Sequence, residues 1–192
     1  MAIELHGLMG CQNWAMITIG EIAELKSWKD KESQLGSLDI HQVAEAANNI
    51  QSELQIRDAQ ICNEIDSIRE RYSGPPPHHR TVLYQKYTTL VITRMFVCAA
   101  LVYLQTVVSS DLSILNISAA LSNFMAIMSH VPDPRMFRGL VWPLCVMGCM
   151  ASSQPHQETF RNTITDAMSD PPQIWKLWPG AANPGEVVGN AT

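Results

Sequence analysis

A chain of 192 residues with a formal net charge of −5 is long enough to bury one hydrophobic core, but it shows no excess of basic residues. Its 13 Lys and Arg residues are outnumbered by 18 Asp and Glu residues and are scattered, whereas proteins that grip nucleic-acid phosphates present a basic face. We therefore expect no direct nucleic-acid binding by this chain. The five cysteines are an odd number, and the chain opens without a basic and apolar signal sequence, so we expect a reducing compartment, the cytosol or the nucleus.

The first helix is predicted over residues 13–31, with Asn13 as its N-cap. Apolar residues recur there at spacings of three to five, which places them on one stripe of a helix. Gly36 and Ser37 then break the chain. The stripe consists of Trp14, Ile17, Ile22, Leu25 and Trp28.

A long second helix is predicted over residues 39–72. Asp39 followed by Gln42 resembles a capping box, and apolar residues at spacings of three, four and seven form a sustained seam. A long helix with one apolar seam packs against partner helices. The seam consists of Ile40, Val43, Ala47, Ile50, Leu54, Ile61, Ile65 and Ile68.

The third predicted helix, residues 82–109, contains the most apolar part of the chain. It follows a Gly-Pro-Pro-Pro-His-His linker at residues 74–79, which cannot be helical and has a polyproline-like composition. Residues 90–108 are strongly apolar but include an arginine and a glutamine, whereas a membrane-spanning helix requires about 20 predominantly apolar residues without buried ions. We therefore interpret this segment as the central buried helix and expect no membrane contact.

Three shorter helices are predicted to follow. The first is capped by Asp111 or Ser113 and ends before Pro132 and Pro134. The second covers residues 136–151, with Pro143 kinking or restarting it. The third covers residues 154–169.

The last part of the chain, residues 170–192, is dominated by Gly, Pro, Asn and Ala, with Trp175 and Trp178 as large anchors. Such a composition predicts a disordered Pro/Gly-rich tail. The sequence therefore predicts one domain over residues 1–169, an all-α, irregular bundle of about five to six helices.

Cys145 and Cys149 are the nearest approach to a metal-binding pair. A zinc site requires four ligands, and no second pair lies nearby, so we expect these two side chains to pack in the core as small hydrophobic groups. The adjacent His78 and His79 have no carboxylate beside them and are interpreted as part of the linker. We expect no metal site and no cofactor.

The sequence offers two candidate sets of catalytic side chains, and both are incomplete. Cys11 lies near His6 and a helix start, which favours a reactive thiol, but no third group is present to orient the pair. Glu21 and Glu24 lie three residues apart in the first half of the first predicted helix, and acid–base catalysis would require an opposing group across a cleft. Neither a phosphate-binding glycine loop nor a nucleophile elbow occurs. We expect no catalytic residue and no enzyme activity.

Two further features concern the core. Arg94 and Asp111 are candidates for a half-buried ion pair, because an ion among apolar helices needs a partner. The five tryptophans and ten methionines indicate either a densely packed core or a hydrophobic groove for a ligand or partner helix. The aromatic candidates to line that core or groove are Trp14, Trp28, Tyr103 and Trp142.

Three sequence blocks are informative when they are read together. They contain GCQNW and EIAELKSWK in residues 10–29, TR, AALVYL and VVSS in residues 93–110, and PDPR, LVWPLC and GCMA in residues 132–151. Their order and spacing resemble the regulatory domain of fungal zinc-cluster transcription factors, the fungal-specific domain that follows a six-cysteine, two-zinc DNA-binding motif. The resemblance covers residues 8–165.

This resemblance implies an all-helical regulatory domain, residence in the nucleus and control of transcription, in many relatives of a secondary-metabolite gene cluster. It also implies partners that are other regulators or a second copy of the chain, and in some members a small hydrophobic effector. This chain carries no six-cysteine zinc cluster, so the family's DNA-binding residues have no counterpart here. A truncated regulator would expose apolar surface to a partner or a dimer.

Two readings of the function therefore remain. In the first, the chain is a transcription-regulator domain that acts through protein contacts. In the second, it is a small biosynthetic-cluster protein that binds a hydrophobic metabolite and assists its conversion by proximity, without acid–base residues. In a third reading, the chain is a structural remnant with neither role.

Overall fold

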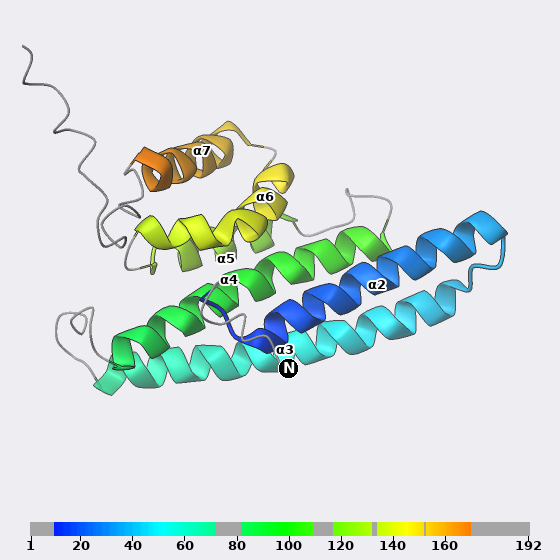
Figure 1. Cartoon of the computed structure of the whole chain (residues 1–192), viewed down its shortest axis with the longest axis horizontal. Coiled ribbons are helices and arrows are strands. Elements are labelled where there is room, and N and C mark those ends of the chain that lie inside the picture. The colour runs from blue at the N-terminus through cyan, green and yellow to red at the C-terminus, as the bar shows by residue number, and fades with distance from the viewer. Residues whose placement is uncertain (1–9, 72–81, 110–116, 132–133, 152, 170–192) are drawn as a thin grey trace, which may run out of the picture.

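The computed structural model describes residues 10–71, 82–109, 117–131, 134–151 and 153–169, and every regular element within these ranges is a helix (Figure 1). The predicted all-α class is therefore confirmed. The linker at residues 74–79 and the predicted tail at residues 170–192 lie outside the described residues.

Three long helices, α2 (Asn13–Leu35), α3 (Ile40–Arg71) and α4 (Val82–Val108), lie side by side along the length of the molecule. In Figure 1, α2 and α4 run in the same direction and α3 runs opposite to both. The apolar seam predicted for residues 39–72 faces this bundle, because seam residues are the ones that α3 buries. The buried residues of α3 are Val43, Ala47, Leu54, Ile61, Ile65 and Ile68.

Helix α4 is the central element of the fold. It packs against α2 and α3 on one side and against α5 (Ile117–Met128) and α6 (Val141–Met150) on the other. Every residue from Leu90 to Ala100 except Arg94 is buried. By length and composition this helix could cross a membrane, but 67% of its apolar window is buried against the other helices. Its apolar composition is therefore explained by packing, as the core interpretation predicts.

The second layer over α4 consists of α5, the short 3-10 helix η2 (Pro134–Leu140), α6 and α7 (Gln154–Ser169). Phe160 of α7 stacks on Phe124 of α5, with ring centroids 5.9 Å apart, and also lies 3.9 Å from the position where a Cβ on Gly148 of α6 would be. A ring that touches both neighbouring helices fixes the position of α7.

The single helix predicted over residues 136–151 is two elements, since the 3-10 turn of η2 ends at Leu140 and α6 begins at Val141. Pro143 is the third residue of α6, and N–H groups in a first turn have no acceptor within the helix, so its missing N–H costs no hydrogen bond. Of the two predicted alternatives, a kink or a restart near Pro143, the structure shows a restart, which lies at Val141.

The N-cap predicted for the first helix is also wrong. Gln12, not Asn13, occupies the extended N-cap position of α2. The backbone N–H of Gln12 donates to Thr93 Oγ1 of α4 at 2.9 Å, and its side-chain Oε1 accepts from Trp14 Nε1 at 2.6 Å. Long-range contacts with α4 therefore set this end of the helix in place of a local side-chain cap.

Other predicted helix ends agree better with the structure. Asp39 Oδ1 accepts the backbone N–H of His41 at 2.8 Å, which is the Asp39 half of the predicted capping box. Helix α5 is described from Ile117, so the predicted caps Asp111 and Ser113 lie outside the described residues.

The predicted break at Gly36 is confirmed, although α2 continues to Leu35, four residues past its predicted end. Gly36 has φ 70° and forms a Schellman motif, in which Gly36 N–H donates to Ser33 O and Ser37 N–H donates to Glu32 O. Only a residue that tolerates positive φ ends the helix in this way.

Alanine substitutions at Gly20 of α2 and at Gly36, the residue that caps α2, are predicted to change the stability in opposite directions. Gly36→Ala should lower the free energy of unfolding by about 1 kcal/mol, because alanine is strained in the left-handed conformation. Gly20→Ala should raise it by up to about 1 kcal/mol, because Gly20 is an exposed interior position of the helix. A Cβ meets nothing within 4 Å at either site, so steric clash plays no part. Urea unfolding, followed by circular dichroism, measures the change in the free energy of unfolding for both variants. Changes of the same sign would contradict the assignment of the helix end.

Candidate functional site

The four aromatic residues predicted to line a core or groove lie around one core cluster, but a ring contact joins only two of them, Tyr103 and Trp142. All four are partly buried against the core cluster that contains Ile22, Leu54 and Val97. Trp14 faces α3, where the Cζ atom of Arg57 lies 4.6 Å from the centroid of its ring. Trp28 follows Trp14 by fourteen residues, which returns it to nearly the same side of α2.

Tyr103 and Trp142, in contrast, meet on the side of α4 that α6 covers. Their rings form a T-shaped pair with centroids 6.1 Å apart and an interplanar angle of 88°. Trp142 also stacks on Phe96 of α4 at 6.1 Å and 5°. These three rings join α6 to α4, so the structure brings together only two of the four predicted aromatics. A role for them in binding a ligand stays a prediction.

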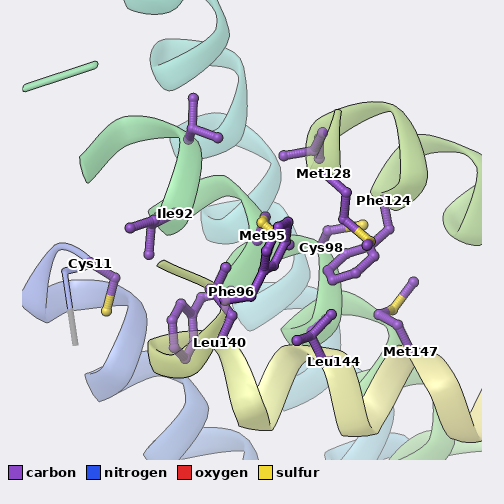
Figure 2. Close-up of a cluster of buried hydrophobic side chains, with 14 of the residues drawn as sticks. Cys11, Ile92, Met95, Phe96, Cys98, Phe124, Met128, Leu140, Leu144 and Met147 are labelled. Atoms are coloured by element: carbon purple, nitrogen blue, oxygen red, sulfur yellow. The ribbon is translucent and has the colours of Figure 1, made fainter. Parts of the chain in front are cut away.

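Helix α6 buries one side deeply and exposes the other. Leu140, Leu144 and Met147 point into the cluster formed by α4 and α5, beside Phe96 and Phe124 (Figure 2). These inward residues are spaced by four and three, as expected for one face of a helix.

The outward side of α6 carries Val141, Cys145 and Cys149, spaced by four, and we call these three residues the α6 stripe. Val141 is 62% exposed and both cysteines are exposed. The prediction that Cys145 and Cys149 pack in the core is therefore wrong. The inward positions are taken by the larger side chains of Leu144 and Met147, and helical geometry then turns the two cysteines outward.

No residue of α6 is charged, so the α6 stripe carries only apolar and thiol side chains. The exposed faces of α2 and α3 carry charged side chains, for example Glu24 and Glu53. An uncharged, largely apolar helix is normally covered on all sides. The α6 stripe is accordingly a candidate interaction surface.

The remaining cysteines are poor nucleophiles. Burial raises the pKa of the Cys11 thiol, and burial raises the pKa of Cys98 to about 12. Burial and the nearby Asp58 carboxylate raise the pKa of Cys62. Because the thiolate is the reactive form, these environments suppress reactivity at neutral pH. His6, the partner considered for Cys11, lies outside the described residues, as do His78 and His79.

No three His, Cys, Asp or Glu side chains come close enough to hold a metal ion within the described parts of the chain. Glu21 and Glu24 are both exposed on α2. The two carboxylates considered for acid–base catalysis therefore lie on an open helix surface.

Arg94 does have the partner that its position demands, but the partner is Asp58 of α3. Arg94 Nε donates to Asp58 Oδ1 at 3.2 Å, and both side chains are about one quarter exposed, at 26% and 27%. The predicted partner Asp111 lies outside the described residues. Burial raises the pKa of the Asp58 carboxyl, and the attraction of the Arg94 guanidinium opposes that rise without cancelling it.

A comparison with protein families gives a match to the fungal specific transcription factor domain over residues 2–178. This match covers nearly the whole chain. The chain belongs to this family. No solved structure matches it.

Curated relatives of this fungal specific transcription factor domain are named as transcription regulators. The chain is 29% identical to the trichothecene biosynthesis transcription regulator TRI10 of Trichoderma arundinaceum over 179 residues, covering 92% of the chain and 36% of the relative. It is 30% identical to the transcription factor dibT of Pestalotiopsis microspora over 156 residues, covering 78% and 25%. It is 27% identical to the ustiloxin B cluster transcription factor ustR of Aspergillus flavus over 169 residues, covering 83% and 28%. The chain thus spans between a quarter and about a third of the length of these relatives.

The ion pair between Arg94 and Asp58 generates a prediction about pH. Because burial raises the folded-state pKa of Asp58, folding is more favourable with Asp58 protonated, and its contribution to stability falls as the pH rises through the ordinary aspartate pKa toward the raised one. Arg94→Met should raise the Asp58 pKa further, since it removes the attraction that favours the carboxylate.

Side-chain carboxyl NMR across a pH titration measures the pKa of Asp58 in both proteins. Arg69→Met is the matched control. Arg69 lies on the same helix as Asp58, its Nη1 is 3.9 Å from Asp66 Oδ1, and its side chain is more exposed than that of Arg94. Removal of Arg69 should therefore leave the Asp58 pKa unchanged. A lower Asp58 pKa in the Arg94→Met protein would contradict the assigned pair.

Proposed function

We propose that this chain is the helical regulatory domain of a transcription regulator that controls a secondary-metabolite gene cluster. The observation that carries the proposal is the family match over residues 2–178. Relatives named for trichothecene biosynthesis and for the ustiloxin B cluster support the narrower role in a metabolite cluster. A regulator of this kind acts in the nucleus.

We further propose that the domain acts through protein contacts and that DNA is bound elsewhere, by another part of the regulator or by a partner. Many of its described cations are already paired with carboxylates or carbonyls, so little free positive charge is offered to phosphates. Lys29 Nζ, for example, donates to Val107 O at 2.6 Å at the carboxyl end of α4. The paired cations are Lys26 with Asp30, Arg57 with Glu53, Arg69 with Asp66, Lys86 with Glu64, and Arg94 with Asp58.

The chemistry of the described surface also supports a role other than catalysis. The α6 stripe offers apolar and thiol groups but no paired acid and base. Such a surface suits contact with another apolar surface, which is what a regulatory domain provides. A partner regulator or a second copy of the chain fits this role, and so does a small hydrophobic effector.

The proposal predicts that loss of the domain changes messenger levels. In the source fungus, Leu144→Asp places a charge in the buried contact between α6 and α4 and should shift transcripts of the neighbouring biosynthetic genes as far as deletion of the gene does. Ile17→Ala is the matched control, because Ile17 is 62% exposed, and it should leave those transcripts unchanged. RNA sequencing together with metabolite profiling makes the measurement.

Loss of the metabolite with unchanged transcripts would refute the regulator role. That outcome would favour the alternative, a protein that binds a hydrophobic metabolite and assists its conversion. Changed transcripts in the Ile17→Ala strain would show that the shift in biosynthetic transcripts does not depend on the packing of α6 against α4.

A further inference from the structure

The α6 stripe presents a physical problem that the described residues leave unsolved. Helix α6 carries no charged side chain on any face, yet Val141 is 62% exposed and Cys145 and Cys149 are exposed beside it. A helix that is apolar all round is stable when it is covered all round. Something beyond the described helices is therefore expected to lie on this stripe.

We propose that residues 171–178 of the same chain dock on the α6 stripe and complete the domain. This segment reads PPQIWKLW and contains four large apolar residues with a single charge. Residues 179–192, in contrast, contain no aromatic residue and no leucine, isoleucine or methionine. The four apolar residues are Ile174, Trp175, Leu177 and Trp178.

The family match gives independent support for this occupant. It continues nine residues past the end of α7 at Ser169 and stops at residue 178, directly after the second tryptophan of the segment. The sequence pattern that defines the domain therefore includes these residues. On this account, the boundary between domain and tail lies near residue 178 and not at residue 169.

The position of α7 brings the segment to the stripe. Helix α7 contacts both α6 and η2, and its more extensive contact is with η2, the element that leads directly into Val141. In Figure 1, α7 runs back from the end of α6 that leads into it, so that its last turn lies on the side of η2. The stripe from Val141 to Cys149 is about 12 Å long at 1.5 Å per residue. Eight residues in an extended, proline-led conformation span about 25 Å, which is enough to cover it.

The two cysteines of the stripe report directly on whether it is covered. Cys145 and Cys149 are exposed in the described structure, whereas burial raises the thiol pKa of Cys11, Cys62 and Cys98. Iodoacetamide labelling of the native full chain, read at each cysteine by mass spectrometry, therefore separates the stripe from the rest of the protein.

We expect Trp175→Ala/Trp178→Ala to speed labelling of Cys145 and Cys149 about tenfold or more over the unmodified chain, because a docked segment must open before the reagent reaches a thiol. Labelling of Cys11 and Cys98 should not change, which shows that the fold is intact. The matched control, Val187→Ala/Val188→Ala, alters the chain beyond residue 178 and should label like the unmodified protein.

A second variant tests the other side of the contact without touching the tryptophans. Val141→Asp puts a charge on an exposed position in the first turn of α6, where a carboxylate is compatible with the helix, and should release the segment with the same gain in labelling. If Cys11 is labelled faster in the tryptophan variant, that variant is generally unfolded. The Val141→Asp variant then still tests the proposal.

Equal labelling of Cys145 and Cys149 in the unmodified chain and in both the tryptophan variant and Val141→Asp would overturn the proposal. So would protection that grows with protein concentration, because it would show that a second copy covers the stripe.

Discussion

The burial of the central part of α4 between two layers of helices is the constraint on which the rest of the structure depends. A helix with this composition must lose its contact with water, and two layers of helices achieve this, α2 and α3 on one side and α5 and α6 on the other. The placement of the aromatic side chains follows from it. Trp142 stacks on Phe96 because α6 covers α4, and Gln12 begins α2 where Thr93 of α4 accepts its N–H.

The same arrangement separates an inert interior from an uncharged patch on the surface. The core is filled by side chains such as Phe96 and Met147, with the thiols of Cys11 and Cys98 buried among them. The described polar surface carries ion pairs within single helices and one between α3 and α4. The α6 stripe differs from this charged surface because it exposes a valine and two cysteines. These properties fit the role that we propose for this part of a transcription regulator, which is action through contacts between surfaces.

The sequence allowed most helices to be predicted, because apolar periodicity and the Gly and Pro residues between segments are local signals. The N-cap of α2 was missed because the contact that sets it, from Gln12 to Thr93, joins residues 81 positions apart. Asp58 was missed as a partner of Arg94 for the same reason, since the packing of α3 on α4 brings the two side chains together. The outward position of Cys145 was missed because a wholly apolar helix gives no sign of which face is inside.

Native-state hydrogen exchange of the full chain tests the central role of α4 most directly. If α4 is buried by both layers, its amides from residue 90 to residue 104 should exchange most slowly and only through global unfolding, so their exchange free energy should equal that of urea unfolding. If α4 instead exchanged through a smaller opening while α2 and α3 stayed protected, the fold would not depend on the burial of α4, and the account would be wrong.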